Sequence, residues 1–191
     1  MRVFFFLAIV MLSSCASVPS PQKQAVGLAA RAELMVTHQN WRIQGRVAYS
    51  HLGKGGSAQI NWLQNAEVSD IKLSGPLSIG TARIVLTPDS AKFFDSKGNV
   101  VAEGDPDVVF LQVLQTPVPK RWFANGLRAF WPDNPELTAS ALAGQVLIDQ
   151  WQWRYLEWQI SPILLPKQIE IKHDETRVRI LIDSWQELPD G

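Results

Sequence analysis

Cys15 is the residue whose type and position most clearly suggest a chemical modification. It is the only cysteine in the 191-residue sequence. It follows the segment MRVFFFLAIVML, in which one positive charge precedes about ten apolar residues, a pattern typical of a secretory signal peptide. The apolar run is shorter than the roughly 20 residues that a transmembrane helix needs. A lone cysteine in an exported protein has no intramolecular disulfide partner, so its presence requires another explanation.

The residues around Cys15 offer that explanation. Leu12-Ser13-Ser14-Cys15 resembles a bacterial lipobox. This resemblance implies cleavage before Cys15, a diacylglycerol thioether on its sulfur and an acyl chain (palmitate) on the new N-terminus. Two or more lipid chains give stable anchoring where one is marginal. Ala16 replaces the Asp that retains lipoproteins in the inner membrane, which favours an anchor in the outer membrane facing the periplasm. An ordinary signal peptide with an unmodified cysteine is the alternative.

The remaining candidate chemical groups form no recognisable constellation. His38, His51 and His173 are far apart, and the sequence contains no Cys/His ligand spacing, no G-x-S-x-G motif and no P-loop. The Gly-rich segment 53–57 precedes a strand pattern rather than a helix, so we interpret it as a hairpin turn. The formal net charge is zero, which gives no electrostatic case for nucleic acid. We therefore expect no metal, no cofactor and no enzymatic activity.

The chain divides into three parts. We interpret residues 1–14 as the signal peptide, residues 15–22 as the lipidated N-terminus and tether, and residues 23–191 as a single domain, expected to be a monomer. Residues 22–37 carry apolar side chains at helical spacing and predict a short amphipathic helix. Strand patterns follow in residues 40–51, 57–64, 69–74, 80–88, 91–95 and 100–104.

The middle of the sequence changes from strand to helix periodicity. Asp105 and Pro106 predict the start of a helix over 105–115, and a second short helix is predicted over 120–132. Further strands are predicted over Leu137–Ala143, Gln145–Trp151, Gln152–Ile160, Gln168–His173 and Arg177–Trp185, with a bend over Pro162–Pro166. The fold class is therefore mostly β with α. We predict an open, strongly curved antiparallel sheet of about eleven strands, an incomplete barrel covered by helices around an apolar cavity.

Apolar side chains from these elements are the candidates for the lining of that cavity. The tryptophans of DQWQWRYLEW allow two interpretations, ordinary core packing or a lining that accepts an acyl chain, and the two overlap because a cavity wall is also core. The acyl-cavity candidates are Trp41, Ile43, Trp62, Ile84, Leu86, Leu111, Leu114, Trp122, Phe123, Trp151 and Trp153.

One turn carries unexpected side chains. Gly75-Pro76 predicts a bend, yet Leu77 and Ile79 stand where polar residues are usual. Two large aliphatic groups at a bend are either packed back onto the domain or exposed for contact with lipid.

The motifs together resemble the LolB family of outer-membrane lipoprotein receptors. Besides the lipobox, they are WRIQGRVAY at the start of the domain, INW in the second strand, the Pro76-Leu77 turn, paired apolar central helices and a closing IDSW strand. The resemblance implies an open, helix-covered sheet around an apolar cavity. It also implies that the protein accepts lipoproteins from the periplasmic carrier LolA and inserts them into the outer membrane, where its partners are cargo acyl chains and outer-membrane phospholipid.

Residue roles follow from the same resemblance. Leu77, with Pro76 and Ile79, matches a protruding loop that inserts cargo into the membrane, although Gly80 comes later than in the family's usual Pro-Leu-Gly turn. A basic face including Arg42, Arg46 and Lys54 is either a docking surface for an acidic carrier or a solvated strand face. Two other functions remain as alternatives: an outer-membrane lipoprotein that binds a free lipid or hydrophobic ligand, and a structural subunit of an envelope assembly.

Overall fold

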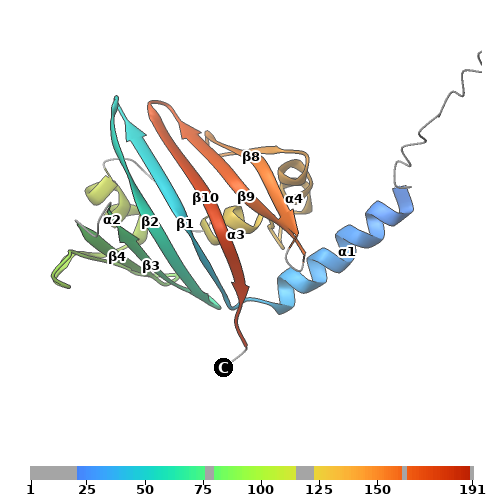
Figure 1. The fold of residues 1–191 in the computed structure, drawn as a ribbon, viewed down its shortest axis with the longest axis horizontal. Helices are drawn as coiled ribbons and strands as arrows, with labels where there is room; N and C mark the ends of the chain where they lie inside the picture. Colours follow the sequence, from blue (N-terminus) through green and yellow to red (C-terminus); the bar gives the residue numbers. More distant parts are fainter. Residues whose placement is uncertain (1–20, 76–79, 115–122, 161–162, 190–191) are drawn as a thin grey trace, which may run out of the picture.

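A single antiparallel sheet is the largest element of the structure (Figure 1). The computed structural model describes residues 21–75, 80–114, 123–160 and 163–189, and the side chains of residues 21–27 and 114 lie outside this description. The strands are β1 (Trp41–His51), β2 (Lys54–Asn65), β3 (Val68–Ser74), β4 (Thr81–Leu86), β5 (Ala91–Phe94), β6 (Val100–Gly104), β7 (Gln145–Ile148), β8 (Trp151–Ile160), β9 (Leu164–His173) and β10 (Thr176–Glu187). The helices are α1 (Pro21–Thr37), α2 (Pro106–Leu114), α3 (Phe123–Arg128) and α4 (Pro135–Leu142).

The order of the strands explains how the two halves of the chain form one sheet. It runs β6-β5-β4-β3-β2-β1-β10-β9-β8-β7, so the first and last strands pair in the middle and β6 and β7 are the two edges. Because the edges do not pair with each other in this order, the sheet is open. The predicted fold class, an open antiparallel sheet with helices, is confirmed, with ten strands among the described residues.

The two faces of the sheet differ because side chains alternate along each strand. In β8, Trp151, Trp153 and Tyr155 are buried, whereas Arg154 is exposed. The buried side chains form the inner face, and α2 and α3 lie on this side, behind the sheet as Figure 1 is drawn. The opposite, outer face is turned toward the viewer.

The predicted start of the first central helix is confirmed. The Asp105 carboxylate accepts a hydrogen bond from the Asp107 amide at 2.9 Å, and Pro106 occupies the first helical position. A side-chain acceptor at the N-cap satisfies an amide that has no intrahelical partner, and proline at the first position loses no hydrogen bond.

The predicted strand Leu137–Ala143 is wrong, because this segment is the helix α4. The Asn134 side chain accepts a hydrogen bond from the Leu137 amide at 3.1 Å, and Pro135 follows it in the first turn. These are the same helix-start signals that identified α2. This correction accounts for the sheet having ten described strands instead of about eleven.

The predicted bend over Pro162–Pro166 is also partly wrong, since β9 begins at Leu164 and includes Pro166. Proline lacks the amide hydrogen that a residue in a central strand donates to one of its two neighbouring strands. Pro166 pairs with Trp158 of β8, but the pairing of β9 with β10 extends only to Gln168. The missing amide of Pro166 therefore costs no hydrogen bond to β10.

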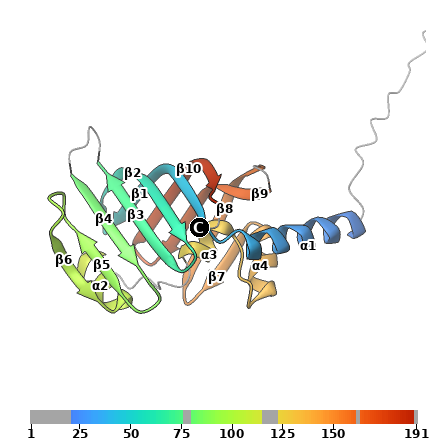
Figure 2. The ribbon, with the colours of Figure 1, turned by 90° about the horizontal axis from the view of Figure 1, so that it is seen from below.

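The predicted N-terminal helix is confirmed as α1, which extends from one end of the sheet (Figure 2). Two arginines hold it there by bonding main-chain carbonyls. Arg31 donates to the carbonyls of Leu164 at 3.0 Å and Arg128 at 2.6 Å, and Arg128 donates in turn to the carbonyl of Met35 at 2.6 Å. Burial lowers the pKa of each guanidinium to about 10, so both stay charged at neutral pH. Each cation lies at a helix C-terminus, where the negative end of the helix dipole compensates it.

Candidate functional site

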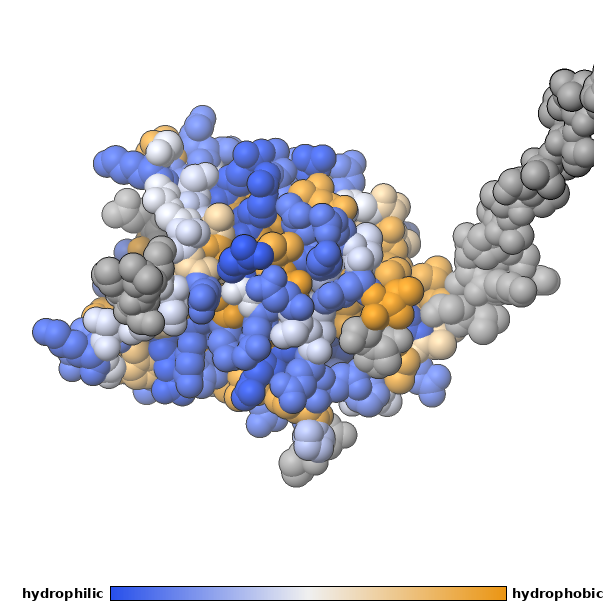
Figure 3. Space-filling view, in the orientation of Figure 1, coloured by the Kyte–Doolittle hydropathy of each residue, from blue (hydrophilic) through white to orange (hydrophobic). Residues whose placement is uncertain are grey.

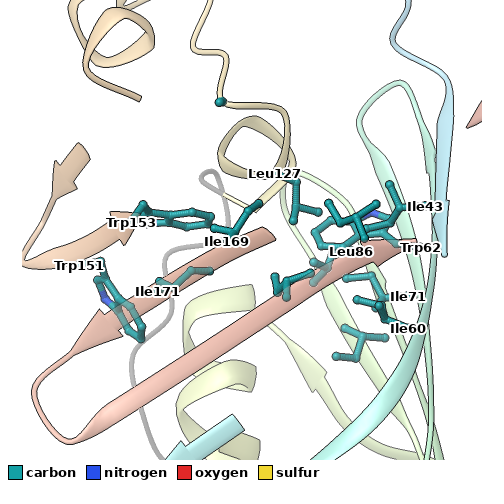
Figure 4. Packing of buried hydrophobic residues seen from close by; sticks show 14 of the residues in the cluster. Ile43, Ile60, Trp62, Ile71, Leu86, Leu127, Trp151, Trp153, Ile169 and Ile171 are labelled. Atoms are coloured by element: carbon teal, nitrogen blue, oxygen red, sulfur yellow. The ribbon is translucent and has the colours of Figure 1, made fainter. Parts of the chain in front are cut away.

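The inner face of the sheet is the candidate site, and it is a continuous apolar surface. Seven of the predicted lining residues are at most 6% exposed and belong to a single hydrophobic cluster. Figure 4 shows several of them converging from different strands toward α3. The seven are Trp41, Ile43, Trp62, Ile84, Leu86, Trp151 and Trp153.

Phe123, another predicted lining residue, connects the central helices to the sheet. Its ring centroid lies 6.1 Å from that of Trp62 on β2, 6.5 Å from that of Trp153 on β8 and 5.7 Å from that of Phe110 on α2. These separations are within the range in which aromatic pairs attract each other beyond simple burial. One side chain at the start of α3 thus contacts both halves of the sheet and the neighbouring helix.

Helix α3 also approaches β8 very closely. A Cβ atom added at Gly126 would overlap the indole ring of Trp153, so only glycine fits at this point. The Tyr155 hydroxyl donates a hydrogen bond of 2.9 Å to the Gly126 carbonyl. Burial raises the pKa of Tyr155, so the hydroxyl stays protonated and remains a donor. This contact fixes the distance between α3 and the inner face.

The structure does not bring every predicted lining residue into this cluster. The Leu111 side chain is 52% exposed and points away from the sheet, because the buried side of α2 is formed by Val109 and Phe110. The Leu114 side chain and Trp122 lie outside the described residues. Cys15 and the segment with Pro76, Leu77 and Ile79 also lie outside them.

The inner face contains residues that the sequence prediction did not include. Leu127 of α3, Ile169 of β9 and Ile182 of β10 are completely buried in the same cluster. The alternation of apolar residues in the two strands was a usable signal, because Ile169 and Ile171 lie two apart, as do Ile180 and Ile182.

A measurable hollow has a largely different lining and shares Trp131 with this cluster. It is a groove of about 620 Å³ between α1 and α4, and it is lined mainly by apolar side chains, including Leu28, Val36, Phe130 and Leu142. None of the predicted lining residues that the structure describes contributes to this groove. The seven in the cluster pack against one another and against side chains of α3.

The chemistry available on the inner face is apolar. Among the described residues, no group of three or more His, Cys, Asp or Glu side chains is placed to hold a metal ion. His173 stacks on Trp151 with a centroid distance of 4.7 Å, and the Trp153 indole nitrogen is buried with no hydrogen-bond partner in the described structure. Such a surface can exchange one apolar partner for another, and it presents few groups that could act as acid or base.

The fold and the site together define the class: a domain with an open antiparallel sheet, an apolar inner face and a cover of short helices. The model of the family described as outer membrane lipoprotein LolB matches residues 39–185. The chain therefore belongs to the LolB family of outer-membrane lipoproteins, as its sequence motifs predicted.

Curated relatives agree over nearly the whole length. The chain is 28% identical to the outer-membrane lipoprotein LolB of Alkalilimnicola ehrlichii, covering 96% of this chain and 95% of that one. It is 30% identical to the protein of the same name from Xanthomonas oryzae pv. oryzae, with coverage of 96% and 94%. The corresponding values for Azoarcus sp. are 27% identity with coverage of 94% and 92%.

A solved structure shares the fold. It is a DUF1329 family protein from Desulfovibrio piger, with a TM-score of 0.50, 9% sequence identity, and coverage of 90% of this chain and 96% of that one. None of the helices within the described residues is long and apolar enough to cross a membrane.

The contact between α3 and β8 gives a first testable prediction. Gly126→Ala places a methyl group against the Trp153 ring, and we expect it to lower the free energy of unfolding by about 1–3 kcal/mol, as overpacking does. The matched control is Gly56→Ala on β2, where no atom lies within 4 Å of the added Cβ. Chemical denaturation monitored by tryptophan fluorescence measures both. Equal stability of the two variants would show that α3 does not rest on Trp153.

Proposed function

We propose that this protein accepts the acyl chains of lipoproteins from the periplasmic carrier LolA and delivers these lipoproteins to the outer membrane. The observation that carries the proposal is the continuous apolar inner face beneath short helices, in a chain of the LolB family. A ligand whose recognised part is a hydrocarbon chain needs such a surface and needs no catalytic groups.

The acyl chain would enter between the inner face and the helices. Helices α2 and α3 contain nine and six residues and contact the sheet through aromatic side chains such as Phe123. If α3 moves, the Tyr155–Gly126 hydrogen bond must break, while hydrocarbon of the incoming chain can take the place of α3 on the apolar face. Burial of each methylene group contributes about 0.8 kcal/mol in either place. Exchange can therefore proceed without an energy source when the receptor buries slightly more of the chain than the carrier does.

The anchor and the membrane-insertion segment complete the proposal. We assign lipidation to Cys15 and membrane insertion to Leu77, helped by Pro76 and Ile79. The Gly75 amide donates to the Gly80 carbonyl at 2.8 Å, which closes the hairpin of β3 and β4 at the base of residues 76–79. Gly80 has a φ of +78°, a conformation that glycine adopts without strain. This closure supports the proposal, because it defines the base of the turn in which the sequence has Leu77 and Ile79.

A transfer assay tests the central proposal. The chain from Ala16 onward retains every residue that the structure describes, and it is mixed with LolA loaded with a lipoprotein. We expect the cargo to move onto this protein without nucleotide, as measured by pull-down. If the cargo stays on a carrier that is active toward another acceptor while this protein is folded, the proposal fails. A free lipid that co-purifies would then favour the alternative ligand.

The assignment of Cys15 predicts a defined change in mass. The mature protein extracted from membranes should begin at Cys15 and carry a diacylglycerol and an acyl chain, and Cys15→Ala should remain unprocessed and unmodified. Intact mass spectrometry of the two proteins measures the difference. A mature wild-type chain without lipid would contradict the assignment and support an ordinary signal peptide.

The assignment of Leu77 predicts a separation of uptake from delivery. Leu77→Glu removes a contact worth roughly 1.5–3 kcal/mol of burial and should leave folding and cargo uptake intact while stopping delivery to vesicles. Leu52→Glu is the control, since Leu52 is 67% exposed in another hairpin turn. Delivery is followed by flotation of the cargo with vesicles. Normal delivery by Leu77→Glu, or equal loss in both variants, would reject the specific role of Leu77.

A further inference from the structure

Four cations surround one buried carboxylate on the outer face of the sheet. The Glu170 carboxylate pairs with Arg154 at 3.2 Å and with Lys172, Arg177 and Arg179 at 3.0 Å each. We call these five side chains the cation plate. They come from β8, β9 and β10 and are brought together by the register that places Glu170 beside Arg154 on one side and Arg179 on the other.

The cation plate faces away from the apolar site. Ile169 and Ile171, which flank Glu170 along β9, are buried in the core of the inner face. Because neighbouring side chains on a strand point to opposite faces, Glu170 and Lys172 point outward. Figure 3 shows this outer face, where hydrophilic side chains predominate.

The charges of the plate do not balance. Four positive charges and one negative charge give a net charge of +3 in a chain whose formal net charge is zero. Elsewhere on the described strands, ion pairs join one cation to one carboxylate, as Arg46 does with Asp183 and Lys92 with Glu103. The predicted basic face, which includes Arg42, Arg46 and Lys54, is partly neutralised in this way at Arg46.

The burial of the five side chains leaves the positive charge accessible. The Glu170 side chain is 2% exposed, whereas the four cations are 34–50% exposed. Burial by itself would raise the pKa of Glu170, but hydrogen bonds from Lys172 and Arg179 and the charge of Arg177 hold that pKa below its usual value. Glu170 therefore stays ionised at neutral pH, where it organises the four cations and cancels only one of their charges.

We propose that the cation plate binds the phosphate groups of anionic phospholipids at the membrane surface. Arginine guanidinium groups present several donors in a fixed geometry that suits phosphate oxygens. A protein partner is less consistent with the plate, because protein interfaces place aromatic or aliphatic anchors at their centre and this centre is a carboxylate. The proposal rests on the outer-membrane location of the family, which keeps the domain close to a lipid surface.

This contact would also orient the domain. With the outer face against the lipid headgroups, the inner face and its helices α2 and α3 are directed away from the membrane (Figure 1). The apolar site would then face the periplasm, where a soluble carrier can reach it. The plate and the acyl-chain site thus serve different contacts on opposite faces of one sheet.

Vesicle binding by the chain from Ala16 onward tests the proposal. We expect binding to mixed phosphatidylglycerol–phosphatidylcholine vesicles, little binding to phosphatidylcholine alone, and loss of binding near 1 M salt, where the screening length is about 3 Å. Each cation near an anionic surface contributes about 1 kcal/mol, so the double variant R177Q/R179Q should bind about 25-fold more weakly. The control K92Q/K97Q removes the same charge from the β5–β6 hairpin at the far edge and should change binding much less.

Glu170→Gln provides a test of opposite sign. It removes the negative charge and raises the net charge of the plate from +3 to +4, so vesicle binding should increase by about fivefold. A role in stability alone predicts no increase. Circular dichroism establishes that each variant is folded, and Lys172→Gln, which should weaken binding, replaces Glu170→Gln if the latter does not fold.

Several outcomes would overturn the proposal. The first is an equal loss of vesicle binding in R177Q/R179Q and in the control K92Q/K97Q. The second is equal binding of the parent protein to neutral and anionic vesicles. The third is that R177Q/R179Q loses the parent's binding to LolA but binds vesicles as well as the parent does. The last outcome would make the plate a protein-docking surface. Cargo uptake from LolA should be normal in R177Q/R179Q. If the proposed receptor function is wrong, the parent protein itself will fail to take up cargo from LolA. That failure is measured in the transfer assay and is therefore distinct from a failure to bind vesicles.

Discussion

The pairing of β1 with β10 is the constraint on which the rest of the structure depends. These strands come from opposite ends of the domain, and their pairing joins the sheet formed by β1–β6 to the sheet formed by β7–β10. The register shifts between Gln44 and Gly45, and a side chain at Gly45 would overlap the Leu181 carbonyl. This bulge bends the centre of the sheet where curvature is needed, because bulges increase local twist. Without this long-range pairing the inner face would be divided into two separate halves.

The inner face stabilises the fold, and under the proposed function the same atoms also bind the ligand. Its tryptophans and isoleucines pack together with side chains of α3 in the structure, and under the proposed function an acyl chain would replace some of these contacts. The free energy of such an exchange is the difference between burying apolar surface against α3 and burying it against the acyl chain. This difference is much smaller than either burial free energy alone. This is physically suited to a receptor that must both take up a chain and release it. The Tyr155–Gly126 hydrogen bond and the close Trp153 contact position α3 without covering the site with charged groups.

The polar groups have different roles at the two ends of the domain. At the base of α1, Arg31 and Arg128 are buried and each bonds main-chain carbonyls near a helix C-terminus, so their charges hold α1 in place. In the cation plate, the carboxylate is buried and the cations remain accessible to solvent and to partners. Arginine thus has a structural role at the base of α1, where it is buried. In the cation plate, a buried carboxylate arranges arginines at the surface, where they are accessible for recognition.

The sequence by itself determined the family and most strands, because these depend on local motifs and on period-two alternation. The start of α2 was also predictable from adjacent residues, Asp105 and Pro106. Asn134 and Pro135 provide the same signal at the start of α4, and this signal outweighs the strand propensity of the residues that follow. Tertiary structure alone decided which side of α2 is buried, and therefore that Leu111 is exposed. It also decided that Arg154, Glu170 and Arg179 meet, since residues so far apart in sequence become neighbours only through the register of three strands. Such contacts depend on long-range pairing, which local patterns do not encode.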